Sequence, residues 1–331
     1  MKRFLFLVLI ILLTGCTEKS SNKELESKSG KSTVNGFKEL YFVGIYAGLP
    51  SIYRYDYAED KSRIFWSNKD ERVLELLVSE DRKAAYFVTK RRQRLKSSKP
   101  AIERGQLYRF DLESKKVELI SQLEEGIQII PFWTDNDRFT LIINSIDKTV
   151  ASYVNKSTQV YNQFGKLISD NNETFDLTKD GFPVTNFPPL QYVSPSEKQK
   201  VAVIKDTIKI QQFEPKNDFE FYIEDKEIKQ IGWNENNKKV IILLLHKNET
   251  DVIQKDKISS SLIIFDLDKQ KIVKTFEGAG YKRFVLIGDF LIFDNSFGRD
   301  SFIEILNLKS LNEERKIKIT GGCGLKNIPA L

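Results

Sequence analysis

The fold is decided by the stretch Leu76-Leu-Val-Ser-Glu-Asp-Arg-Lys-Ala-Ala-Tyr-Phe-Val88 and, after a basic insert, Gly105-Gln-Leu-Tyr-Arg-Phe-Asp-Leu-Glu-Ser-Lys-Lys-Val-Glu-Leu-Ile120. Four short apolar runs alternate here with three polar segments. No run is long enough for a globular helix, and each is rich in Val, Ile, Leu, Tyr and Phe, which favours strands. The last two runs, Leu107–Leu112 and Val117–Ile120, predict a hairpin. The stretch therefore predicts a four-stranded antiparallel meander, which is one blade of a β-propeller.

The rest of the chain repeats this unit. The expected third strand of each unit carries a recognisable signature, at a spacing of about 40–60 residues that fits propeller blades with variable loops. It occurs as Tyr53-Arg-Tyr-Asp, Tyr108-Arg-Phe-Asp, Tyr161-Asn-Gln-Phe-Gly, Phe221-Tyr-Ile-Glu-Asp, Ile264-Phe-Asp-Leu and Ile305-Leu-Asn-Leu. One blade cannot bury both of its faces, so neighbouring blades must pack face to face. Six copies therefore predict an all-β, six-bladed propeller with four-stranded antiparallel blades.

The first unit is incomplete. Its strands are expected at Glu39–Tyr46, Ser51–Asp56 and Arg63–Trp66, and the innermost strand is missing. At the other end, the tail Leu325–Leu331 is left over after the sixth unit. We therefore expect the C-terminal tail to supply the innermost strand of the first blade.

The middle of the chain gives a weaker pattern. Between Ser169 and Pro189, polar residues and prolines predict a long surface insertion. The fourth unit is expected to contain, in order, Leu190–Val193, Lys200–Lys205, either Thr207–Phe213 or Phe219–Ile223, and a closing strand around Lys226. Short strands with frequent turns also fit a pair of β-sandwiches. The repeated order of turn, strand, loop, strand and hairpin favours the propeller.

Two of these motifs carry a family resemblance. Val78-Ser-Glu-Asp-Arg-Lys-Ala-Ala-Tyr-Phe-Val, followed by Leu107-Tyr-Arg-Phe-Asp-Leu, resembles the TolB-like propeller repeat, and Tyr192-Val-Ser-Pro-Ser-Glu-Lys is the nearest copy of its turn. The resemblance extends over most of residues 39–320, although the turns lack the glycine of that repeat. It implies a TolB-like propeller. Families with this repeat include periplasmic interaction modules and parts of peptidases, so the resemblance implies a fold and not an activity.

The N-terminal sequence has the pattern of a targeting segment. Lys2-Arg3 precedes the apolar run Phe4–Leu13, which is too short to span a bilayer. The following Leu13-Thr-Gly-Cys16 resembles a bacterial lipobox, which implies a signal peptide over residues 1–15 and a lipid on Cys16. The alternative is a plain secretory signal. Residues 16–36 then form a polar tether and residues 37–331 the propeller, anchored by lipid to a membrane of the cell envelope and facing outside the cytoplasm.

Composition sets further bounds. The chain has 331 residues, more than a usual single core, which fits a repeat array. Its formal charge of +6 is modest and does not indicate a nucleic-acid partner. With Cys16 lipidated, Cys323 has no partner, so we expect no disulfide framework.

Few residues suggest catalysis. His246 is the only histidine, and neither a nucleophile elbow nor a phosphate-cradling glycine loop is present. Asp135-Asn-Asp137 and Asp266-Leu-Asp268 fall in expected hairpin turns, where Asp and Asn are favoured, and they lack the Gly and distal Glu of a calcium loop. The sequence therefore predicts no catalytic residue, no metal and no cofactor.

Two segments are candidates for binding. The first is the basic run Lys90, Arg91, Arg92, Arg94 and Lys96, expected in the loop between the second and third strands of the second blade. It is either a solvated loop or a contact for an anionic surface such as lipid head groups or an envelope polymer. The second candidate is the set of aromatic residues in the insertion, which either pin it down or form a recognition patch. They are Phe175, Phe182 and Phe187.

The sequence thus predicts a lipid-anchored, extracytoplasmic binding or scaffold protein whose rim loops meet an envelope protein or an anionic polymer. The alternative is a hydrolase or lyase that acts on carbohydrate with paired carboxylates in the propeller channel. Two close carboxylates, one with a raised pKa, would favour the enzyme.

Overall fold

The structure is a computed structural model of the chain. It describes residues 38–79, 83–91, 105–123, 128–135, 137–147, 149–150, 152–180, 190, 192–213, 216–223, 225–246, 260–278, 281–295, 301–319 and 324–325. All of them belong to one compact unit, Gly36–Leu331. These ranges contain no helix, and hence none with the length and apolarity needed to cross a membrane.

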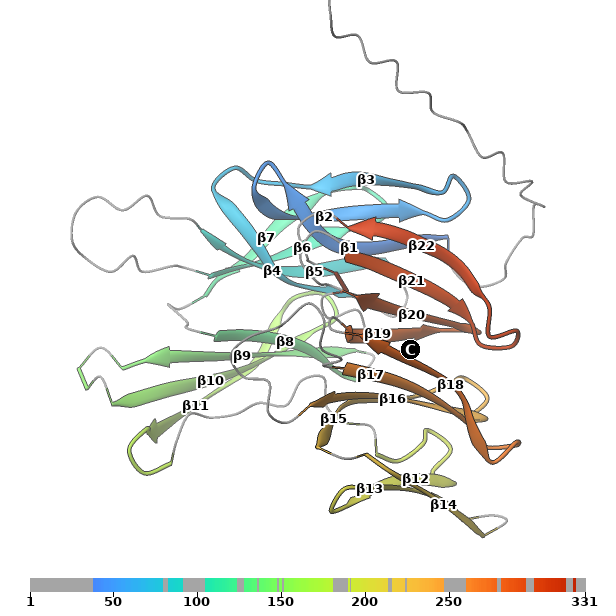
Figure 1. Cartoon of the computed structure of the whole chain (residues 1–331). Coiled ribbons are helices and arrows are strands. Elements are labelled where there is room, and N and C mark those ends of the chain that lie inside the picture. The colour runs from blue at the N-terminus through green and yellow to red at the C-terminus, as the bar shows by residue number, and fades with distance from the viewer. Residues whose placement is uncertain are drawn as a thin grey trace, which may run out of the picture. The chain divides into compact units, whose positions relative to one another are not determined.

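Within these ranges, 22 strands form six antiparallel sheets that follow one another along the chain (Figure 1). The first three sheets contain β1 (Glu39–Tyr46), β2 (Leu49–Asp56) and β3 (Lys61–Trp66); β4 (Glu71–Val78), β5 (Ala84–Arg91), β6 (Gly105–Asp111) and β7 (Val117–Gln122); and β8 (Gln128–Asp135), β9 (Arg138–Ile146), β10 (Tyr153–Asn162) and β11 (Leu167–Asp176). The last three contain β12 (Gln199–Ile204), β13 (Thr207–Gln212) and β14 (Asn217–Tyr222); β15 (Lys226–Trp233), β16 (Lys239–His246), β17 (Ser260–Asp266) and β18 (Lys271–Gly278); and β19 (Tyr281–Ile287), β20 (Phe290–Asn295), β21 (Ser301–Asn307) and β22 (Glu313–Ile319).

Every sheet is a meander in which each strand pairs with the next strand of the chain. Four sheets have four strands, and the first and fourth have three. The chain is therefore an all-β protein with the six antiparallel blades of a propeller, as the repeated sequence unit predicts.

The central strands are apolar along their whole length because both of their faces are buried. In β5, Tyr86 and Val88 belong to a cluster shared with the third sheet, whereas Ala85 and Phe87 belong to a cluster shared with the first. A strand with a single buried face would alternate apolar and polar residues, as β14 does with Phe219 and its exposed neighbours. Burial on both faces thus explains the unbroken apolar run that opens the sequence analysis.

The same clusters show which sheets are neighbours. Apolar clusters join the first sheet to the second, the second to the third, the fourth to the fifth and the fifth to the sixth. The sixth sheet reaches the first through Phe290, whose ring centroid lies 6.4 Å from that of Tyr57. The guanidinium of Arg315 also lies over the Tyr57 ring, 5.2 Å from its centroid. The two ends of the propeller are therefore in contact.

The described part of the C-terminal tail lies beside the first sheet, which is the incomplete unit. The N–H of Val43 in β1 donates to the C=O of Gly324 at 3.1 Å. Leu325 is fully buried, and its N–H donates to Oδ2 of Asp294 in β20 at 3.1 Å. The tail thus bonds both to the inner edge of the first sheet and to the sixth sheet.

The fourth sheet differs from the prediction. Leu190–Val193 contributes only an isolated bridge, Val193 to Lys200, and no strand. Both candidates for the third strand are real, because β13 and β14 cover them, but the signature at Phe221 lies in the outer strand β14. The expected closing strand around Lys226 is wrong, since Lys226 begins β15 of the fifth sheet.

Two expected loops are partly strand. The insertion predicted from Ser169 is wrong for its first eight residues, which lie in β11 and pair with β10. β11 is a polar, exposed outer strand, so its residues carry no apolar alternation that would reveal it. Likewise, Lys90 and Arg91 do not lie in the loop, because they complete β5.

Candidate binding site on the first strands of the sheets

The first strands of the second, fifth and sixth sheets contact one another through side chains. Arg283 of β19 pairs with Glu75 of β4, 208 positions away, with Nη1–Oε2 at 3.1 Å and Nη2–Oε1 at 3.5 Å. On the other side, Gln230 of β15 donates from Nε2 to the C=O of Phe284 at 2.7 Å and accepts its N–H at 3.0 Å. β19 is therefore tied to both β4 and β15.

Each of these three strands carries a β-bulge, at which the register with its second strand shifts. The extra residues are Leu74 in β4, Lys229 in β15, and Lys282 and Arg283 in β19. A bulge leaves a residue without a partner across the ladder and redirects its side chain. Basic residues thus occupy the bulges of two of the three strands.

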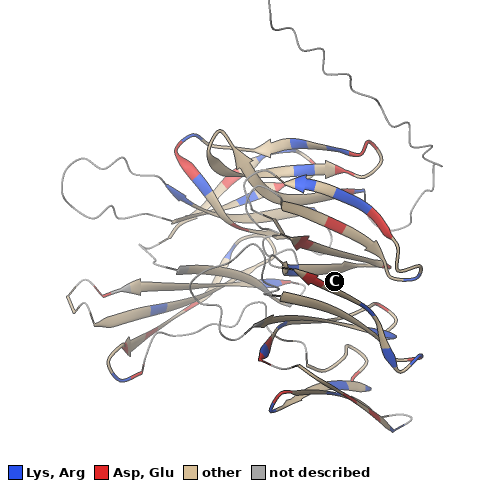
Figure 2. Ribbon diagram, in the orientation of Figure 1, with Lys and Arg blue, Asp and Glu red and all other residues tan. Residues whose placement is uncertain are grey.

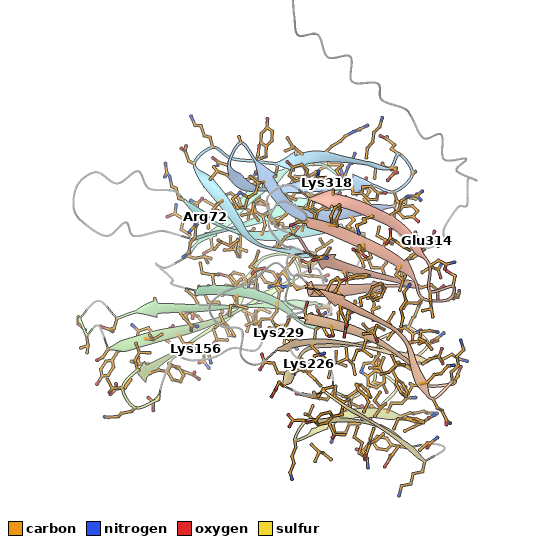
Figure 3. The ribbon with its side chains drawn as sticks, in the orientation of Figure 1. Arg72, Lys156, Lys226, Lys229, Glu314 and Lys318 are labelled. Atoms are coloured by element: carbon orange, nitrogen blue, oxygen red, sulfur yellow. The ribbon has the colours of Figure 1, made fainter. Side chains whose placement is uncertain are left out.

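Positive charge exceeds negative charge on these strands. Together β4, β15 and β19 contain five Lys or Arg and three Glu. We call the four whose side chains the structure describes the first-strand cluster: Arg72, Lys226, Lys229 and Arg283 (three of them labelled in Figure 3). By contrast, basic and acidic residues mix along outer strands such as β22 (Figure 2).

Two of the three glutamates are already engaged. Glu75 pairs with Arg283. Glu71 is buried and accepts from Oγ1 of Thr89 at 2.8 Å and from the hydroxyl of Tyr108 at 3.1 Å. Burial, together with the charge of Glu71, raises the pKa of Tyr108 to about 12. Glu71 therefore links β4 to β5 and β6 within the second sheet.

The cations differ in how firmly they are held. Nζ of Lys226 donates to Oγ of Ser261 at 3.0 Å, and the backbone N–H of Arg283 donates to the buried Asp294 at 2.8 Å. Lys229 is half-buried, and within the described part of the chain its side chain forms no hydrogen bond or ion pair. A partly desolvated cation without a counter-ion attracts an anion more strongly than one in open solvent. The arrangement can therefore bind an anion.

The start of the predicted basic segment lies beside this cluster. Lys90 and Arg91 stand opposite Arg72 and Glu71 in the ladder between β5 and β4. Lys90 is only 9% exposed, whereas Arg91 is exposed. The segment therefore leaves β5 at the end of the second sheet where β4 begins. Arg92, Arg94 and Lys96 lie outside the described residues.

The other predicted residues do not join this cluster. Phe175 lies half-buried in the outer strand β11, with Nζ of Lys156 at 5.7 Å from its ring centroid. His246 is the last residue of β16, opposite Lys226 in the ladder. Four further residues lie outside the described part of the chain: Cys16, Phe182, Phe187 and Cys323.

The described carboxyl groups with shifted pKa values all shift downward. Hydrogen bonds from Ser114 lower the pKa of Asp111, those from Thr149 lower that of Asp147, and those from Thr178 lower that of Asp176. At Asp266, burial raises the pKa, but the backbone N–H of Lys269 and the ammonium of Lys239 lower it further. These groups are ionised at neutral pH and cannot act there as proton donors. The described ranges also contain no group of three His, Cys, Asp or Glu residues that could hold a metal ion.

Sequence reasoning missed the pair Glu75–Arg283 and the bridge through Gln230. The partners are far apart in the chain, and no local pattern joins them. The feature that could have indicated these contacts is a polar residue within the first strand of several sheets. These residues are Glu75, Gln230 and Arg283.

No protein-family model matches the sequence, and no curated protein matches it. Similar solved structures include TolB from Acinetobacter baumannii, with 12% identity over 88% of this chain and a TM-score of 0.48. This chain spans 65% of the length of that TolB chain. A functionally unknown protein from Desulfotomaculum acetoxidans has 10% identity, coverage of 87% and 99% of the two chains, and a TM-score of 0.47. The periplasmic gluconolactonase PpgL of Pseudomonas aeruginosa has 12% identity, coverage of 86% and 96%, and a TM-score of 0.43.

Proposed function

We propose that this protein is a non-catalytic binding protein of the bacterial cell envelope that recognises an anionic polymer through the first-strand cluster. In this proposal residues 1–15 are a signal peptide, Cys16 carries the lipid, and residues 16–36 tether the propeller of residues 37–331 outside the cytoplasm. The observation that carries the proposal is Lys229, which is half-buried and forms no hydrogen bond or ion pair with the residues that the structure describes.

Three features support an anionic ligand. The strands that carry the cluster are linked through Glu75–Arg283 and Gln230–Phe284, so the backbone positions of its cations are set before a ligand binds. Five Lys or Arg against three Glu give the three strands a net positive charge. The basic segment that begins at Lys90 and Arg91 adds further cations at the same end of the second sheet. A polymer of phosphodiester units presents closely spaced charges that can meet several of these groups at once.

The lowered carboxyl pKa values favour binding over the carbohydrate-acting enzyme. An acid catalyst for glycoside cleavage needs a carboxyl group whose pKa is raised and a second carboxylate nearby. Where the described carboxyl groups depart from their ordinary pKa, their hydrogen bonds keep them ionised.

The test is a titration of the full chain, in a zwitterionic detergent, with poly(glycerol phosphate) at low and high salt. We expect Lys229→Glu to weaken binding by at least about tenfold at low salt, and added salt to weaken binding by the native chain. Lys318→Glu is the matched control, because Lys318 is an exposed lysine on the outer strand β22 (Figure 3). It should change the affinity by less than about twofold.

Equal effects of the two substitutions, or no binding by the native chain at low salt, would contradict the proposal. If polyglutamate binds as well as the phosphodiester polymer and displaces it, the partner is an acidic protein segment instead.

A further inference from the structure

A small pocket lies between the second and third sheets, away from the first-strand cluster. Its volume is about 290 Å³, at the lower end of the range for small-ligand sites. Its polar and aromatic lining consists of Lys83, Arg109, Asp111, Glu113, Gln163 and Phe164. These residues come from the turn between β4 and β5, from β6 and the turn that follows it, and from the turn between β10 and β11. The pocket thus lies at the end of β4 opposite Arg72.

Phe164 lies exposed at the tip of a turn whose backbone is held by hydrogen bonds. Its side chain is 70% exposed, an unusual state for a large apolar residue. Oδ1 of Asn162 accepts the N–H of Phe164 at 3.0 Å and that of Lys166 at 2.9 Å. The hydroxyl of Tyr86 in β5 donates to the C=O of Gln163 and fixes the turn against the second sheet. The backbone of this turn is therefore fixed beside the pocket, and it carries the exposed Phe164 ring.

Beside this ring lie polar groups with unused hydrogen-bonding capacity. The side chain of Arg109 is 23% exposed, and its Nη2 lies 3.5 Å from Oδ2 of Asp111. Oδ1 of Asp111 accepts both the N–H and the hydroxyl of Ser114, at 2.8 and 2.9 Å. The side chains of Glu113 and Gln163 form no hydrogen bond or ion pair with the described residues. The pocket therefore offers a guanidinium donor, a carboxylate acceptor and an amide that does both.

The charges of the described residues that line the pocket balance. Lys83 and Arg109 are positive, whereas Asp111 and Glu113 are negative. A balanced set gives no net attraction for an anion or a cation, in contrast to the first-strand cluster. It suits a neutral molecule with several hydroxyl groups, since each hydroxyl both donates and accepts. The C–H groups on the flat face of a sugar ring carry partial positive charge and suit the negative face of an aromatic ring.

We propose that this pocket binds one sugar residue of a neutral glycan, stacked on Phe164 and hydrogen-bonded by Gln163, Glu113 and Arg109. The site is separate from the first-strand cluster, so a glycan and an anionic polymer can be bound at opposite ends of the second sheet. Its test is therefore independent of the proposed function.

The test is calorimetric titration of the full chain with two neutral trisaccharides, chitotriose and maltotriose. The detergent must be zwitterionic, because a sugar-based detergent would compete for the pocket. We expect at least one trisaccharide to bind, and Phe164→Ala to weaken that binding at least tenfold. Phe164→Trp keeps a flat aromatic face and should retain binding.

Phe213→Ala is the matched control. Phe213 is also exposed, at 49%, in the turn between the outer strands of the fourth sheet, and no pocket residue surrounds it. Its substitution should leave trisaccharide affinity unchanged, as should Lys229→Glu. The proposal is overturned if neither trisaccharide binds the native chain. It is equally overturned if Phe164→Ala and Phe213→Ala have the same effect, or if Lys229→Glu abolishes trisaccharide binding.

Discussion

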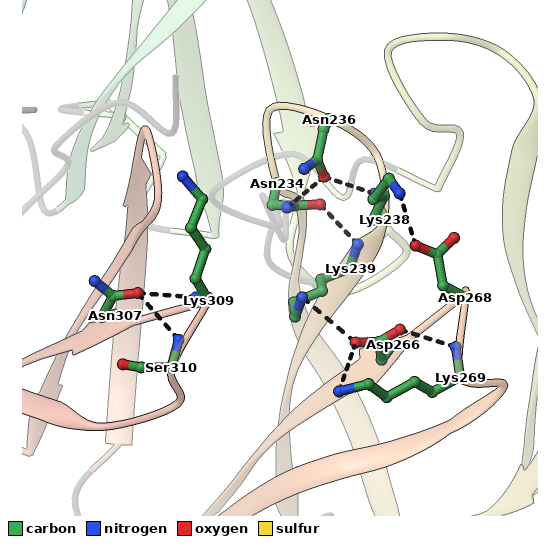
Figure 4. Close-up of polar contacts among 10 residues, drawn as sticks. All are labelled: Asn234, Asn236, Lys238, Lys239, Asp266, Asp268, Lys269, Asn307, Lys309 and Ser310. Atoms are coloured by element: carbon green, nitrogen blue, oxygen red, sulfur yellow. Dashed lines mark hydrogen bonds and ion pairs between the residues drawn. The ribbon is translucent and has the colours of Figure 1, made fainter. Parts of the chain in front are cut away.

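Asn and Asp side chains at the ends of strands stabilise the tight turns of this protein. Oδ1 of Asn307 accepts the N–H of Lys309 at 2.9 Å and that of Ser310 at 3.2 Å (Figure 4). Oδ1 of Asn234 accepts the N–H of Lys239 at 2.7 Å across the turn between β15 and β16. These bonds satisfy backbone donors that have no ladder partner in a turn. Both side chains therefore serve local structure.

Substitution of Asp266 is the clearest test of the stabilising role of these turn side chains. It is buried, pairs with Nζ of Lys239 at 3.4 Å and accepts the N–H of Lys269 at 2.9 Å (Figure 4). Asp266→Asn keeps an acceptor for the N–H but leaves Lys239 without its counter-charge. We expect a loss of about 1–2 kcal/mol of unfolding free energy at pH 7, measured by urea denaturation.

The effect of this substitution should depend on pH. Because the pKa of Asp266 lies below its ordinary value of 3.8, the stabilisation is fully present above that value. It is lost as the pH falls through the folded-state pKa, so the native chain and the variant should converge in acid. Asp268→Asn is the control, since Asp268 forms an exposed pair with Lys238 at 2.8 Å. A loss for Asp268→Asn as large as that for Asp266→Asn would contradict this account.

At the scale of the element, β16 shows how a central strand is buried on both of its faces. In β16, Ile242 packs in the cluster shared with the fourth sheet, and Ile241 packs in the cluster shared with the sixth. Both side chains are fully buried. Adjacent residues of one strand therefore stabilise two different interfaces.

This arrangement predicts that Ile241→Val and Ile242→Val each lower the free energy of unfolding by about 0.5–1.5 kcal/mol. Ile204→Val is the matched control, because Ile204 is 57% exposed at the end of β12. It should change the stability by less than about 0.5 kcal/mol. If only one of the two β16 substitutions is destabilising, β16 has a single buried face and the assignment to two clusters is incorrect. Chemical denaturation of the three variants decides this.

The same difference in burial explains which elements could be predicted from the sequence. The apolar strand β1 is predicted to the residue at both ends, because its run of apolar residues ends at a polar turn. The part of the outer strand β11 from Ser169 onward could not be predicted, because a solvated edge strand has no apolar period to detect. In the fourth sheet, the turn between Ile204 and Thr207 is too short to contain a clear turn motif. The sequence therefore did not determine the order of the strands there.

At the scale of the whole molecule, the two ends of the chain meet. Gly324 bonds to β1, and the buried Leu325 bonds to Asp294 of the sixth sheet. The missing strand of the first unit and the unused tail were both visible in the sequence, so this contact could be predicted. None of the four residues of the first-strand cluster was predicted from the sequence as a binding residue. The sequence marked the segment that starts at Lys90, but the cations of β15 and β19 needed the three-dimensional arrangement.

The tail should therefore contribute to global stability. Ending the chain before Leu325 removes a buried leucine, worth about 1.5–3 kcal/mol, and one hydrogen bond to Asp294. We expect the melting temperature to fall by roughly 4 °C or more, measured by circular dichroism. A chain that ends after Leu325 is the control and should fall by less. An unchanged melting temperature on removal of Leu325–Leu331 would exclude a stabilising role for the tail.

The central claim is that the first strands of separate sheets come together, which places Arg283 of β19 on Glu75 of β4. The most direct measurement is a double-mutant cycle of unfolding free energies with Glu75→Gln, Arg283→Gln and the double variant. Because the pair is two-thirds or more buried and bidentate, we predict a coupling energy of about 1 kcal/mol or more. Strictly additive effects of the two substitutions would mean that β4 and β19 do not meet, and the proposed anion site would have no structural basis.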